Sequence, residues 1–91
     1  MKRINLDASH DTLDKVYDAF ERQLGLKHGF GRNLDALWDV LTTDVRGPIE
    51  VVWHQRGALG QDGERLLATL NEVARERKDF RLILDWASGR T

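Results

Sequence analysis

Apolar residues recur with two different periods along this chain, and the two periods separate strands from helices. Short β-rich or alternating stretches predict three strands, at 3–6, 49–53 and 80–84. Longer stretches with apolar residues at every third or fourth position predict three helices, at 11–24, 33–43 and 62–78. The chain therefore alternates between β and α elements from one end to the other.

The predicted helices begin and end at residues with capping chemistry. Asp11 and Asn33 can each accept a hydrogen bond from a backbone amide of the first turn, so both are predicted N-caps. Gly25 follows the first helix, at the place where a left-handed residue ends many helices. Three glycines fall within 55–63, and this stretch is predicted to be a loop.

The order of the elements predicts the fold class. Strands that are separated by helical crossovers pair in parallel, with crossovers of right-handed sense. We therefore expect an α/β protein with a small three-stranded parallel sheet, packed with three or four helices. Its 91 residues fit a single domain that spans 1–91.

Composition narrows the classes of function. The chain has 14 basic and 15 acidic residues and a formal net charge of -1, so no overall field favours nucleic acid or an anionic membrane. It has no cysteine, which excludes disulfides, thiolate metal sites and cysteine nucleophiles. The N-terminal residues show no apolar signal segment, and no apolar run approaches a membrane span of about 20 residues. These features predict a soluble cytoplasmic protein.

Two aspartates on the second predicted helix form an unusual pair. Asp35 and Asp39 are four residues apart, a spacing at which like charges repel by about 0.2–0.5 kcal/mol. On a helical wheel both lie roughly 100–140° from the centre of the apolar stripe, so they share an outward face. One interpretation is a solvated helix face. The other is an anionic site that meets a cationic cleft of a partner, such as the phosphate-binding active site of a nuclease.

Catalysis by this pair is a weaker alternative. A glycosidase places two carboxylates on opposite sides of a pocket, roughly 5–9 Å apart. Two carboxylates on one convex helix face do not form such a pocket, although a concave pocket around Asp35 or Asp39 would favour a small enzyme. Glu76 is a further acid, late in the third helix, and an ordinary surface ion pair with a neighbouring cation would explain it.

Metal, phosphate and nucleic-acid sites receive little support. His10, His28 and His54 are scattered without metal-ligand spacing, so no metal or cofactor is predicted. Gly29 and Gly31 form a G-x-G before a helix, but the third glycine of a dinucleotide-binding motif is missing.

Several basic residues near the second helix raise the question of RNA binding. They are Lys27, His28, Arg32 and Arg46. No ladder of aromatic residues alternates with them, and the chain as a whole is slightly acidic. We therefore expect no direct contact with nucleic acid.

The segment "FGRNLDALWD" at 30–39 resembles the helix "YGENLDALWD" of barstar-type ribonuclease inhibitors. The likeness continues through Leu41, Thr42, Val45, Pro48 and Trp53, and weakly again at "VARERK", 73–78. The resemblance implies a compact α/β fold with three parallel strands. It also implies a protein that blocks the active site of a small secreted ribonuclease and performs no catalysis itself.

The resemblance also implies which residues contact the partner. The acidic contact residues of the family fall on Asp35, Asp39 and Glu76. Other positions that match or neighbour its contact helix, or that shape the loop before it, are Gly31, Asn33, Leu34, Trp38 and Thr42.

Four positions depart from the family pattern. Gly29 stands where the archetypal member of the family has a contact tyrosine, and Thr43 and Asp44 stand where that protein has glycine and tryptophan. Arg32 replaces an acid, and together with other nearby cations it is expected to dilute the acidic field. We therefore expect a partner other than the archetype's own nuclease.

The sequence thus predicts an intracellular inhibitor of the immunity or antitoxin type, with a basic, barnase-like microbial ribonuclease or a related toxin as its partner. It predicts no enzyme activity, metal, cofactor or membrane association. The alternative is a protein-interaction module that has the same fold and a partner that is not a ribonuclease.

Overall fold

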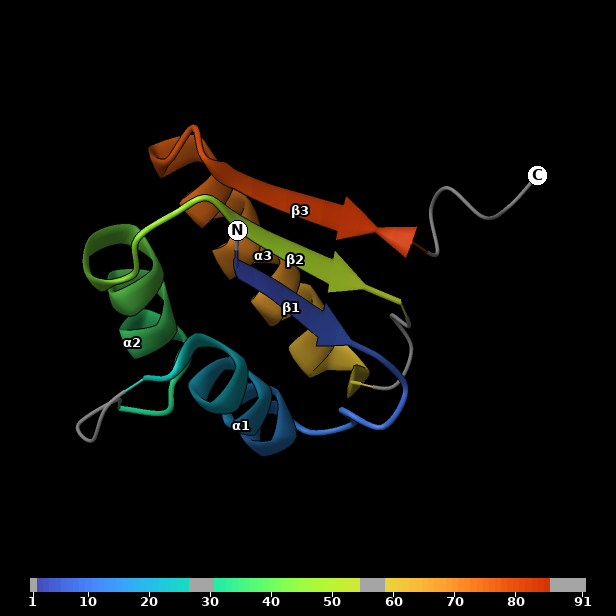
Figure 1. The fold of residues 1–91 in the computed structure, drawn as a ribbon. Coiled ribbons are helices and arrows are strands. Elements are labelled where there is room, and N and C mark those ends of the chain that lie inside the picture. The colour runs from blue at the N-terminus through green and yellow to red at the C-terminus, as the bar shows by residue number, and fades with distance from the viewer. Residues whose placement is uncertain (1, 27–30, 55–58, 86–91) are drawn as a thin grey trace.

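The computed structural model describes residues 2–26, 31–54 and 59–85, and it shows an α/β fold (Figure 1). Its elements follow one another in the predicted order. They are β1 (Lys2–Leu6), α1 (Leu13–Leu24), α2 (Leu34–Asp39), the π-helical segment η1 (Val40–Asp44), β2 (Ile49–Trp53), α3 (Gln61–Glu76) and β3 (Phe80–Leu84).

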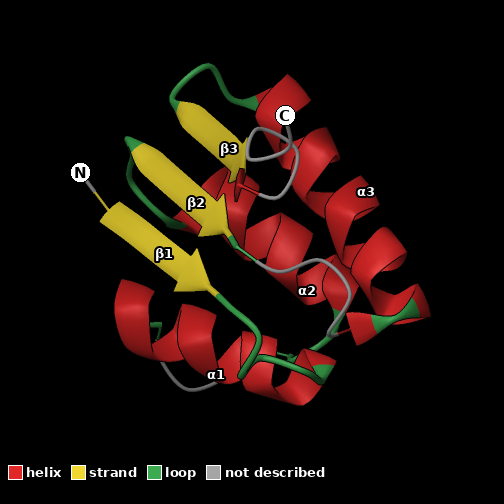
Figure 2. Cartoon of the chain, turned by 90° about the vertical axis from the view of Figure 1, so that its right-hand side faces the viewer, coloured by secondary structure: helices red, strands yellow, loops and turns green. Residues whose placement is uncertain are grey.

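The three strands form one parallel sheet in the order β1-β2-β3, as predicted. The register aligns Leu6, Trp53 and Leu84 across the sheet. Because the strands lie in chain order, crossovers of a single hand place all their helices on the same face. The helices do lie together on one face of the sheet (Figures 1 and 2).

The hydrophobic core lies between this face and the helices. Alternate residues of the strands point into it, and Ile4, Val51 and Trp53 are almost completely buried. The helices contribute residues such as Phe20 and Leu37, which are fully buried. On α3, Leu66, Leu70 and Val73 are buried, in agreement with the helical spacing of apolar residues in the predicted helix 62–78, while Leu67 and Ala74 pack against the core from its margin.

The beginning of α1 corrects one prediction. Thr12 is the N-cap, because its hydroxyl accepts a hydrogen bond from the backbone amide of Lys15 at 3.2 Å. Asp11, the predicted cap, instead forms an ion pair with the Lys15 ammonium at 2.9 Å. Gly25 ends the helix in the left-handed conformation, with φ of 66°, as predicted.

The predicted boundaries of α3 also need correction. The helix begins at Gln61, so the last residues of the predicted loop 55–63 are helical. It ends at Glu76, two residues before the predicted end, because Arg77 has an extended backbone with φ of -128° and ψ of 131°. Residues 55–58 and the predicted tail 88–91 lie outside the described residues.

The second helix is one continuous element with a change of winding inside it. Asn33 is its N-cap as predicted, and its side chain accepts a hydrogen bond from the backbone amide of Ala36 at 2.7 Å. From Val40 the winding becomes π-helical, and the amide of Val45 donates to the carbonyl of Val40 at 3.1 Å. π-Helical turns occur frequently at functional sites, which directs attention to this helix.

Candidate functional site

Asp35 and Asp39 point away from the core on α2. Both are exposed, and neither carboxylate forms a hydrogen bond or ion pair with any described residue. On the opposite side of the same helix, Leu37 and Leu41 are fully buried and fix its orientation. The two carboxylates are therefore held on a rigid element, and no other described residue neutralises them.

Glu76 brings a third carboxylate from the neighbouring helix. It is the last residue of α3, which packs against α2, and its side chain is exposed and has no partner among the described residues. An acid at a helix C-terminus is disfavoured by the helix dipole. We call Asp35, Asp39 and Glu76 together the acidic face.

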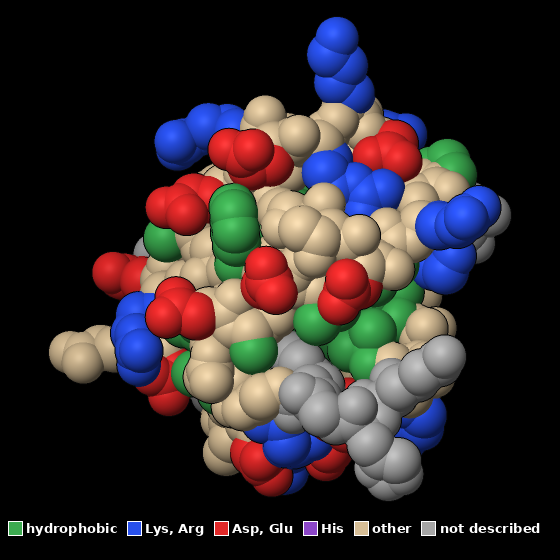
Figure 3. Space-filling model, turned by 90° about the vertical axis from the view of Figure 1, so that its left-hand side faces the viewer, with side chains coloured by type: hydrophobic (Ala, Val, Ile, Leu, Met, Phe, Trp, Pro, Cys, Tyr) green, Lys and Arg blue, Asp and Glu red, His purple; other side chains and the backbone are tan. Residues whose placement is uncertain are grey.

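The space-filling view shows the side of the molecule on which α2 lies. Several acidic side chains lie across the middle and left of this side, and most basic side chains lie around its edge (Figure 3). This side therefore carries side chains of both charges, with several acids near its centre.

Two apolar residues of α2 lie at the margin of the core. Leu34 and Trp38 are half-buried and pack against the buried cluster. The indole Nε1–H of Trp38 is covered, and no described residue offers an acceptor within hydrogen-bond distance of it. A buried donor without a partner costs about 1–3 kcal/mol, so Trp38 is not optimised for stability alone.

The polar residues predicted around the acidic face serve the local backbone. The amide side chain of Asn33 caps the helix and also donates to the Gly31 carbonyl at 3.3 Å. The Thr42 hydroxyl donates to the carbonyl of Trp38 at 2.8 Å. A Cβ at Gly31 would lie 3.0 Å from the Cβ of Ala36, so a side chain at Gly31 would crowd the start of the helix.

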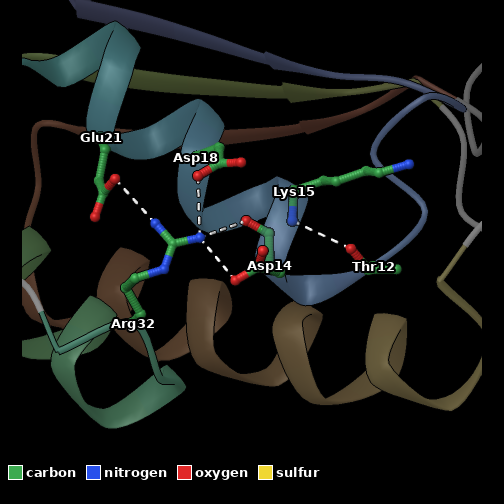
Figure 4. A network of polar contacts seen from close by, with 6 residues as sticks. All are labelled: Thr12, Asp14, Lys15, Asp18, Glu21 and Arg32. Carbon is green, nitrogen blue, oxygen red and sulfur yellow. Dashed lines mark hydrogen bonds and ion pairs between the residues drawn. The ribbon is translucent and has the colours of Figure 1, made fainter.

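Arg32, just before α2, is held by three acids of α1 (Figure 4). Its guanidinium lies 2.8 Å from a carboxylate oxygen of Asp14, 3.0 Å from Asp18 and 2.9 Å from Glu21. It also lies over the ring of Tyr17, at 5.8 Å from the centroid. Hydrogen bonds to Asp14 above all, and to the other two acids, raise the pKa of Arg32.

This network changes the expected role of Arg32. The sequence predicts a cation that dilutes the acidic field, whereas the structure directs its charge toward α1 and forms no ion pair between it and Asp35 or Asp39. The φ of Arg32 is 53°, a left-handed conformation that the contacts to α1 hold in place. Lys27, His28 and Gly29, the other loop positions considered above, lie outside the described residues.

One residue at this site was missed by the sequence analysis. Arg77, which directly follows Glu76, extends its guanidinium to the carbonyl oxygens of Leu41 and Val45, where the second helix ends. An arginine after a helix has no distinctive spacing, and only the change to extended backbone at this residue reveals the contact.

A comparison with protein families shows to which family this chain belongs. The family model described as barstar (barnase inhibitor) matches residues 1–85. The chain belongs to the barstar family. A relative from Bacillus subtilis (strain 168), named "Putative ribonuclease inhibitor YrdF", is 31% identical over 91 residues, which cover 93% of this chain and 100% of the relative.

Neither a cluster of metal ligands nor a membrane-spanning helix occurs among the described residues. Within 2–26, 31–54 and 59–85, no group of three or more His, Cys, Asp or Glu side chains could hold a metal ion. In the same ranges, no helix combines the length and the apolar character needed to cross a membrane.

Proposed function

We propose that this barstar-family chain inhibits a small, basic microbial ribonuclease by inserting its acidic face into the active site of that enzyme. The observation that carries this proposal is the state of the three carboxylates. Asp35, Asp39 and Glu76 are exposed, lie on two packed helices and have no partner among the described residues. The membership of the chain in the barstar family and its similarity to a relative named a putative ribonuclease inhibitor support the same proposal.

The physical basis is a complementarity of charge. A ribonuclease active site binds the phosphates of RNA through cationic groups, and rigid carboxylates can occupy the positions of these phosphates. The repulsion between Asp35 and Asp39 in the free protein is then relieved when the cations of the partner arrive. Charges at the rim of such an interface mainly change the association rate, whereas central charge pairs mainly change the dissociation rate.

The residues beside the carboxylates give the interface its shape. Trp38 and Leu34 provide an apolar surface beside the carboxylates, and the segment from Gly31 to Asn33 sets the entry to the helix. Thr42 contacts the partner from the following turn. No cofactor, metal or catalytic step is involved, and the protein protects the cytoplasm of the cell that produces the ribonuclease.

An inhibition assay tests the proposal. RNA cleavage by a panel of purified secreted microbial ribonucleases, barnase among them, is measured with and without an excess of the chain, and binding is measured by calorimetry. We expect inhibition of at least one enzyme. The Asp39→Asn variant should inhibit that enzyme much more weakly.

Asp11→Asn is the matched control, because Asp11 is also exposed and the substitution removes the same charge at the start of α1. It should inhibit like the wild type. Equal losses for Asp11→Asn and Asp39→Asn would show that only the net charge matters. Absence of binding to every ribonuclease of the panel would favour an interaction module with another kind of partner and would overturn the proposal.

A further inference from the structure

Arg77 joins the two helices that carry the acidic face. Its Nη1 donates hydrogen bonds to the carbonyl oxygen of Leu41 at 2.7 Å and to that of Val45 at 2.6 Å. These carbonyls belong to the end of the second helix, whereas Arg77 itself ends α3 and directly follows Glu76. Its side chain is only 13% exposed.

The two carbonyls need such a donor. The last carbonyl groups of a helix have no intrahelical partner, and a cation near them also interacts favourably with the helix dipole. The guanidinium of Arg77 supplies both the donors and the charge. The end of η1 is thereby attached to the end of α3 by a charged group instead of by apolar packing alone.

The rest of the guanidinium is fixed from the other side. Its Nε and Nη2 donate to the two carboxylate oxygens of Asp79, each at 2.9 Å, in a two-pronged arrangement that sets the plane of the group. Gly47 packs against this pair, because a Cβ at that position would overlap the Asp79 carboxylate and lie 2.6 Å from Nη2 of Arg77. The guanidinium therefore has little freedom to tilt or withdraw.

We propose that Arg77 is a positioning residue that sets the spacing between the carboxylates of Asp39 and Glu76. The inference rests on the proposed function for its biological meaning, but the geometric claim stands on the contacts of Arg77 alone. Asp39 lies two residues before Leu41, and Glu76 lies next to Arg77. The guanidinium of Arg77 thus connects the backbone of the second helix, which carries Asp39, with the end of α3, which carries Glu76.

A lysine cannot replace this group. An ammonium can donate to one or two of the acceptors, but it lacks the flat fork that binds the Asp79 carboxylate and the helix carbonyls at once. The contacts of Arg77 therefore distinguish positioning from a simple need for positive charge. Arg77→Lys should keep the charge and lose the fixed geometry.

A spacing measurement tests the geometric claim without any partner. Because the chain has no cysteine, spin labels can be attached specifically at Asp39→Cys and Glu76→Cys, and their separation measured by electron paramagnetic resonance. We expect Arg77→Met to broaden and shift the distribution of distances, and Arg77→Lys to do so in part. Arg75→Met is the matched control, since Arg75 is exposed on the same helix and forms no hydrogen bond or ion pair with any described residue.

Binding kinetics test the consequence for recognition. They are measured for each ribonuclease of the panel that the wild type inhibits. We expect Arg77→Met to raise the dissociation rate about tenfold and to leave the association rate nearly unchanged. A tenfold change corresponds to about 1.4 kcal/mol, which lies within the range of interaction energies between residues that act together. In a Glu76→Gln background the same substitution should have a smaller effect, because one of the positioned carboxylates is already lost.

The outcomes separate the two proposals. If the wild type inhibits no ribonuclease, the proposed function fails while the spin-label spacing still decides the role of Arg77. If Arg77→Met keeps the distance distribution of the wild type and only lowers the melting temperature, Arg77 has a merely structural role and the positioning claim fails. Circular dichroism at the temperature of each measurement establishes that the variants are folded, and Arg77→Lys provides a second, milder variant.

Discussion

Neutralising Asp39 should make the protein more stable and a poorer binder at the same time. Asp39→Asn keeps the size of the side chain and removes its charge. The structure shows no contact that the substitution would break, because the carboxylate is exposed and has no partner among the described residues. The hydroxyls of Thr42 and Thr43 bond to the backbone carbonyl of Asp39, at 3.2 and 2.6 Å, and they remain in place.

The gain in stability can be worked out from two terms. Removing the repulsion with Asp35 at the i, i+4 spacing contributes about 0.2–0.5 kcal/mol. The helix dipole adds little, because Asp39 lies midway along the continuous helix 34–44 and the dipole acts mainly within the first and last turns. In a domain of this size 1 kcal/mol corresponds to about 4–8 °C, so a gain of about 0.2–0.5 kcal/mol predicts a rise of about 1–4 °C in melting temperature.

Differential scanning calorimetry at low ionic strength measures this rise, and binding to the inhibited ribonuclease is measured on the same samples. Asp11→Asn is again the control, because Asp11 forms an ion pair with Lys15 and its neutralisation should not increase stability. A fall of more than about 2 °C for Asp39→Asn would refute the reasoning, since it would mean that the carboxylate supports the fold.

Three further predictions concern the contacts that hold the second helix. Gly47→Ala should lower the free energy of unfolding by about 1–3 kcal/mol in urea titrations, because the added Cβ overlaps the Asp79 carboxylate; an unchanged midpoint would show that this carboxylate moves aside freely. Hydrogen bonds from Arg77 hold the pKa of Asp79 below its ordinary value of 3.8, so the stability that they contribute is present above this value and is lost as the pH falls through the lower pKa of the folded state. Asp79→Asn should therefore show a shallower loss of stability below about pH 4, and parallel curves for the two proteins would contradict this assignment. Arg32→Met should lower the melting temperature at low salt and much less at high salt, because the ion pairs to α1 are partly exposed; a difference that does not depend on salt would point to lost packing instead.

The strands and their pairing could be predicted from the sequence because their signal is local. The stretches 49–53 and 80–84 are short and apolar, and their observed bounds agree with the prediction. The parallel order then follows from the helices between them. The cap of α1 shows the limit of such arguments, because Asp11 and Thr12 are adjacent and both have capping chemistry. Local propensity does not choose between them, and the choice depends on where the helix packs.

The π-helical winding of η1 leaves no trace in the hydrophobic pattern. Leu37, Leu41 and Val45 follow one another at intervals of four, and all three are buried. This interval is wider than the 3.6 residues of an α-helical turn, so it suits an α-helix and a locally widened helix almost equally well. The apolar pattern therefore predicts that this segment packs on the core, and only the backbone hydrogen bonds of the folded chain show how it is wound.

The acidic face was partly predictable because a helical wheel assigns faces. Asp35 and Asp39 fall away from the apolar stripe on any regular helix, and both are exposed in the structure. The role of Arg77 was not predictable by the same method. A helix that continued to 78 would leave it as one of several surface cations, whereas the helix ends at Glu76 and the extended backbone at Arg77 turns its side chain toward Leu41, far away in sequence. The sequence therefore shows which charges are exposed on the second helix, whereas the contact between Arg77 and the end of that helix is determined by where α3 stops.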